Sequence, residues 1–162
     1  MPFTPYHMGP GILIKSLLQG SFSLLLFGFT QVLMDLQPLF SIITGIGTLH
    51  GFSHTYIGAT LIAVISGFLG KYIFDFIFKY RKIKVVLSWK ITFISAFIGS
   101  YSHIVLDSIM HSDMNPFYLL QIPNNLLYLL SNQQLHDFCL ISGIVGFVLY
   151  EVIKRLYRKV TK

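Results

Sequence analysis

A stripe of histidine and aspartate residues near the middle of the chain carries the side chains best suited to chemistry. His103, Asp107 and His111 follow one another at intervals of four residues, and Asp113 comes just after them. Residues four apart lie on one face of an α-helix, so two imidazoles and a carboxylate should line a single face. The stripe ends an apolar segment, where ionisable groups are costly and usually functional. A His and an Asp one turn apart are well placed to bind one metal ion.

A second histidine pair, His50 and His54, also has a spacing of four. Together with His103 and Asp107, this pair would supply three nitrogen ligands and one oxygen ligand. Catalytic zinc sites use three protein ligands and leave one position open for water, which the metal activates. The alternative for each pair is a hydrogen-bonded contact between packed membrane helices. Two such pairs at one depth favour a metal site.

The segments that must position these residues are mostly apolar. The chain has 162 residues, of which 54% are hydrophobic and 11% charged, whereas soluble domains are about one quarter charged. The mean hydropathy is +0.68. This balance predicts one integral-membrane helical domain over residues 1–162, in contact with membrane lipids.

The distribution of charge predicts an orientation in the membrane. The net charge is +6, and Lys and Arg concentrate in residues 79–90 and 154–162. Both stretches flank apolar runs, as cytoplasmic loops do under the positive-inside bias. The basic C-terminal tail is therefore expected in the cytoplasm, and no nucleic-acid partner is expected. Cys139 is the one cysteine, which excludes an intramolecular disulfide and a thiolate zinc cluster.

The apolar periodicity predicts an all-α, multi-pass transmembrane bundle with three to four spans. The clearest spans are residues 55–78, 91–110 and 138–153, and a mixed segment, 115–134, is expected to form an extracytoplasmic loop. Residues 39–49 are too short to span. Residues 11–34 are compatible with one span or with two short helices in a re-entrant hairpin.

The predicted topology brings the ionisable residues to one membrane face. If residues 79–84 are cytoplasmic, the spans place eight residues near the outer face: His50, His54, His103, Asp107, His111, Asp113, His136 and Asp137. His7 and Asp35 join them only if residues 11–34 form a hairpin. A single crossing would leave His7 on the inner side, and both alternatives remain open at this point.

Several motifs resemble those of the YdjM-like family, described as LexA-regulated, inner-membrane, metal-dependent hydrolases. They are Gly51-Phe52-Ser53-His54-Thr55, Tyr101-Ser102-His103-Ile104-Val105-Leu106-Asp107, Pro116-Phe117, His7-x-x-x-Gly11 and Val32-Leu33-Met34-Asp35. They occur in family order over about two thirds of the chain. Two positions depart from the family pattern. Gln37 occupies the position of a second acidic residue, and His50 occupies the position of an arginine.

The resemblance implies a divalent metal site, with zinc expected, drawn from His7, Asp35, His54, His103 and Asp107. It implies the bacterial inner membrane and favours the hairpin over residues 11–34. His50 is a further candidate ligand. We assign catalytic or auxiliary roles to Asp35, His111 and Asp113, and rim positions to His136 and Asp137. The expected activity is metal-dependent hydrolysis of a lipid or other phosphoester at the membrane surface.

Two other functions compete with a hydrolase. A metal or proton transporter needs polar groups through the full membrane depth, and the inner halves of the spans offer little beyond Lys15, Lys71 and Asp75. A structural membrane protein with buried His/Asp pairs would show scattered pairs and no single cluster. The sequence leaves the substrate, the metal count and the oligomeric state open.

Overall fold

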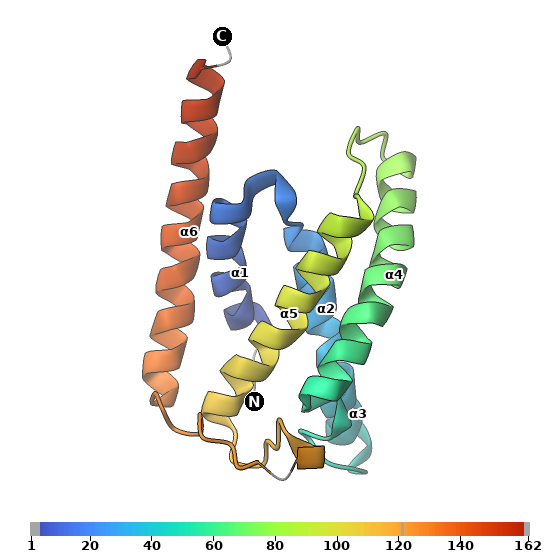
Figure 1. Ribbon diagram of the computed structural model, residues 1–162, viewed down its shortest axis with the longest axis vertical. Helices are drawn as coiled ribbons and strands as arrows, with labels where there is room; N and C mark the ends of the chain where they lie inside the picture. Colours follow the sequence, from blue (N-terminus) through green and yellow to red (C-terminus); the bar gives the residue numbers. More distant parts are fainter. Residues whose placement is uncertain (1–3, 121, 161–162) are drawn as a thin grey trace.

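The computed structural model describes residues 4–120 and 122–160, and over these residues the chain forms helices and no strand. Six α-helices follow one another, α1 (Thr4–Leu18), α2 (Leu24–Met34), α3 (Leu36–Thr44), α4 (Tyr56–Tyr80), α5 (Trp89–Met110) and α6 (Asn132–Val160) (Figure 1). Short 3₁₀ turns are η1 (Gln19–Ser21), η2 (Phe52–His54) and η3 (Tyr118–Leu120). The predicted all-α class is confirmed.

Four stretches of the described chain are long and apolar enough to cross a membrane. They are Leu24–Thr44, Tyr56–Tyr80, Trp89–Met110 and Asn132–Tyr157. The shortest has 21 residues, which at 1.5 Å per residue spans about 30 Å, the thickness of a hydrocarbon core. The chain is thus a multi-pass membrane protein. The predicted segment 39–49 does not stand alone, because α3 continues the direction of α2 after Asp35.

Residues 11–34 form a helical hairpin, which settles the alternative left open by the sequence. Helix α1 has 15 residues, too few to cross a bilayer alone, and α2 returns alongside it after η1 (Figure 1). The Lys15 ammonium closes the turn by donating to the carbonyls of Gln19 and Phe22 at 2.5 and 2.7 Å. The Ser23 hydroxyl then caps α2 by accepting from the Leu26 amide. The hairpin returns Asp35 to the end of the bundle where α1 begins.

Helix α5 packs against both α2 and α4, while α1 packs along α6 (Figure 1). A buried apolar cluster of Met34, Ala59, Ile104 and Met114 joins α2, α4, α5 and the segment after α5. This cluster excludes water from the end of the bundle where α5 carries His103 and Asp107.

Two glycines allow α1 and α6 to approach closely. A Cβ atom on Gly9 would lie 1.9 Å from the Cys139 carbonyl oxygen, and one on Gly146 would lie 2.5 Å from the Leu13 nitrogen. Small residues at such crossings let membrane helices pack backbone to backbone. Helix α6 runs without a break from Asn132 to Val160, so the predicted last span and the basic tail are one helix within the described residues.

The two ends of the bundle differ in character. The loop between α4 and α5 and the C-terminal end of α6 lie at one end, together with the α1–α2 turn (Figure 1). The start of α1, the α2–α3 junction and the end of α5 lie at the opposite end. The basic segments thus lie at the opposite end of the bundle from the start of α1 and the end of α5.

Candidate metal centre

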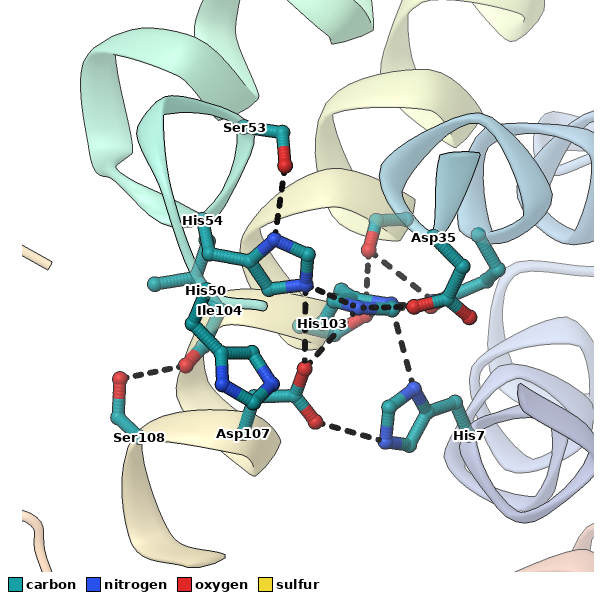
Figure 2. A network of polar contacts seen from close by, with 12 residues as sticks. His7, Asp35, His50, Ser53, His54, His103, Ile104, Asp107 and Ser108 are labelled. Carbon is teal, nitrogen blue, oxygen red and sulfur yellow. Dashed lines mark hydrogen bonds and ion pairs between the residues drawn. The ribbon is translucent and has the colours of Figure 1, made fainter. Parts of the chain in front are cut away.

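Four separate segments meet at the histidine-bearing end of the bundle. His7 lies in the first turn of α1, Asp35 joins α2 to α3, and His54 ends η2 just before α4. His103 and Asp107 occupy successive turns near the end of α5. Figure 2 shows the five side chains turned toward one another. The structure therefore brings together the complete set implied by the sequence motifs.

The ligand atoms of His54, His103 and Asp107 are spaced as around one ion. Nε2 of His54 is 3.2 Å from Nε2 of His103, and these atoms are 3.4 and 3.1 Å from Oδ2 of Asp107. Oδ1 of Asp35 is 3.3 Å from the same nitrogen of His103. Bonds of 2.0–2.1 Å in a tetrahedral zinc site separate neighbouring ligand atoms by about 3.3–3.4 Å. The residues present therefore fit a divalent cation.

His7 approaches the opposite side of the Asp107 carboxylate. Its Nε2 is 3.3 Å from Oδ1 of Asp107, and its Nδ1 is 3.2 Å from Nδ1 of His103. The rings of His7 and His103 meet edge to face at 4.6 Å. Asp107 is thus the shared residue of the centre, with one oxygen facing His54 and His103 and the other facing His7.

Two outer contacts orient the imidazoles. The Gln31 amide donates from Nε2 to the Gly99 carbonyl at 3.1 Å, which turns Oε1 toward Nδ1 of His103 at 2.5 Å. Because an amide oxygen only accepts, Nδ1 of His103 carries a proton, and Nε2 is the ring atom that faces the Asp107 carboxylate. The Ser53 hydroxyl contacts Nδ1 of His54 at 2.8 Å, so that Nε2 faces inward. Such partners raise the affinity of histidine ligands for metals.

The buried carboxylate of Asp107 requires a positive charge close to it. His54, His103 and Asp107 are all 0% exposed. Neither Asp107 oxygen has a hydrogen-bond partner of good geometry among the described residues, although ring nitrogens lie within 3.1–3.4 Å. A buried carboxylate left without compensation costs several kcal/mol. Mixed imidazole and carboxylate donors suit zinc and similar divalent ions.

His54 is held in the protonation state that a metal requires. Burial lowers the pKa of its imidazole, and this effect outweighs the opposing influence of the nearby Asp107 carboxylate. The ring is therefore neutral at pH 7 and can donate an electron pair to a cation.

The remaining predicted residues form a neighbouring group. Nδ1 of His50 is 2.8 Å from both carboxylate oxygens of Asp113, and the His111 ring stacks on His50 at 4.2 Å. His50 also lies near His54 and Asp107, so it stands between the two groups.

Two further predicted residues lie outside both groups. The His136 ring stacks on Tyr6 at 4.5 Å, and Asp137 accepts a hydrogen bond from Gln133 at 2.8 Å. Both side chains belong to α6, which contacts α1 at this end of the bundle.

Sequence reasoning did not identify Gln31, although one signal was available. Gln31 precedes Asp35 by four residues and so shares its helix face, the same spacing that singled out the histidine pairs. A buried amide on that face needs partners, and here they are His103 and Gly99.

Comparisons with described protein families, with curated proteins and with solved structures found no match to this chain.

Proposed function

We propose that this protein is a membrane-bound hydrolase that depends on a divalent metal, with zinc the first expectation. The observation that carries the proposal is the convergence of the ligand atoms of His54, His103 and Asp107, which are fully buried, at 3.1–3.4 Å from one another. Asp35 adds a carboxylate oxygen 3.3 Å from Nε2 of His103. Motifs that resemble the YdjM-like hydrolases contain all four residues and support the same activity.

A divalent cation bound there would activate water and neutralise charge on a phosphoryl or carbonyl oxygen. His54, His103 and Asp107 would hold the cation, with Gln31 and Ser53 fixing the two rings. Asp35 differs from them because its side chain is 19% exposed, so it lies where water and substrate can enter. Its carboxylate can accept a proton from an attacking water as well as contact the cation.

The position of the centre supports a substrate at the membrane surface. One candidate span begins at Tyr56, two residues after His54, and another ends at Met110, three residues after Asp107. Polar groups at that depth would meet lipid headgroups. We therefore propose a lipid or another membrane-associated phosphoester.

An open apolar cavity between α1 and α6 supports the lipid alternative. It measures about 620 Å³ between α1 and α6 and is lined by Tyr6, Met8, Ile12, Ile144 and Phe147 among others. Tyr6 and Met8 flank His7 in the chain, so the cavity adjoins the turn of α1 that carries His7. An acyl chain in the cavity would leave its headgroup near the centre.

We further propose the bacterial inner membrane as the location, with the metal centre on the outer face. The basic loop of residues 79–84 and the C-terminal end of α6 share the opposite end of the bundle (Figure 1), which the positive-inside bias assigns to the cytoplasm.

The first test is the metal content of purified protein. We expect bound zinc or manganese in wild-type protein and its loss in His54→Ala and His103→Ala. His136→Ala is the matched control, since this histidine stacks on Tyr6 away from the centre and should keep the metal. Normal metal content in both ligand variants would reject the proposal.

The second test is hydrolysis of phospholipid vesicles, measured by release of phosphorylated headgroup, with the same variants as controls.

A further inference from the structure

We propose a second divalent-cation site, formed by His50, His111 and Asp113 and adjacent to the first. The inference rests on the proposed hydrolase for its catalytic meaning, but its ligands are different residues. His50 precedes η2, His111 follows the last turn of α5, and Asp113 lies in the loop beyond. One ligand atom from each lies within 4.8 Å of the others.

Two buried ring nitrogens in this region lack a partner among the described residues, and that of His111 belongs to the proposed second site. His50 is 8% exposed, and its Nε2 atom has no hydrogen-bond partner among the described residues. Nε2 of His111 is likewise buried and unpartnered within the described chain. Buried polar atoms are nearly always paired in native proteins, and a bound ion is one explanation for exceptions.

Packing alone does not account for this group. The hydrogen bond between His50 and Asp113 satisfies Nδ1 of His50 and the carboxylate, and ring stacking orients His111 at 4.2 Å with an interplanar angle of 27°. Neither contact uses Nε2 of either ring. A cation would bind Nε2 of His111 together with Nδ1 of His50 and the Asp113 carboxylate, in place of the proton that the last two share.

The chemistry of the donor set suits a catalytic type of site. Two imidazoles and one carboxylate are the ligands of several hydrolytic zinc centres, in which a further position stays open for water or substrate. Asp113 is exposed on its outer side, with 53% of its side chain accessible, so the site opens toward the surface. An open position there would face an incoming anionic headgroup.

His50 connects the two sites. It belongs to one potential ligand group with His111 and Asp113 and to another with His54 and Asp107. Figure 2 shows the His50 ring beside Asp107. Paired cations stabilise both the attacking and the leaving oxygen of a phosphoester, so a second site favours phosphoesters over carboxylic esters as substrates.

The test is metal stoichiometry in the full chain, purified in detergent, loaded with Zn²⁺ and desalted. We expect two zinc ions per chain in wild type and one in both His111→Ala and Asp113→Asn. His136→Ala should keep two. Circular dichroism and gel filtration of each variant establish that its helices and size are unchanged.

The outcomes separate the two sites. One zinc in wild type with no loss in His111→Ala and Asp113→Asn would overturn the second site while leaving the first. Loss of all zinc in Asp113→Asn would also overturn it, by making Asp113 part of one common centre. If His103→Ala keeps two ions while His111→Ala keeps one, the second site stands and the proposed hydrolytic centre fails. Wild-type protein without zinc would overturn both.

Discussion

Replacing Gln31 by Met tests the metal centre without touching a ligand. Gln31 is 0% exposed, and methionine has nearly the same volume, so the helices should keep their packing. The change removes the oxygen that lies 2.5 Å from Nδ1 of His103 and the donor to the Gly99 carbonyl. Loss of such an outer partner weakens metal binding about 10- to 100-fold, which corresponds to about 1.4–2.7 kcal/mol.

The assay is competition for Zn²⁺ against a chromophoric chelator in detergent at pH 7.5. Gln133→Met is the matched control, because Gln133 is exposed on α6 and contacts Asp137. We expect the control to bind as wild type does. Equal affinity of Gln31→Met and wild type would refute the reasoning, since it would show that the orientation of His103 does not matter for the metal.

Three further predictions concern pH, packing and topology. Zinc should be lost as the pH falls, because imidazole ligands must be neutral. Burial lowers the pKa of His54, so the midpoint of zinc loss should lie below the ordinary histidine value of 6.5. Full retention of zinc at pH 4 would contradict this prediction. Gly9→Ala should destabilise the α1–α6 contact by about 1–3 kcal/mol in thermal unfolding, since its Cβ would lie 1.9 Å from a carbonyl oxygen. Gly20→Ala, with nothing within 4 Å, should be close to neutral, and equal effects of the two substitutions would argue against the packing described. Reporter fusions after residues 84 and 125 should report opposite sides of the membrane, and a cytoplasmic reporter at 125 would overturn the orientation.

The helical class and the principal spans were predictable because they depend on local pattern. Apolar runs of membrane length are visible in the chain itself, and α4 and α5 lie within two residues of the predicted limits at each end. The alignment of His103 with Asp107 was equally local, since it follows from the helical repeat alone.

Assembly of the centre depends on contacts between distant segments. His7 and His103 are 96 positions apart and meet only because α1 and α2 form a hairpin. That turn depends on hydrogen bonds from the Lys15 ammonium to two carbonyls beyond its own helix. The apolar periodicity of the sequence does not predict these hydrogen bonds. The pairing of His50 with Asp113, 63 positions away, depends on how the loop after α5 folds back. Residue types and spacing therefore determined which side chains could bind a cation. The tertiary structure decided which of these side chains lie around the same cation, because helix packing sets ligand distances of about 3 Å.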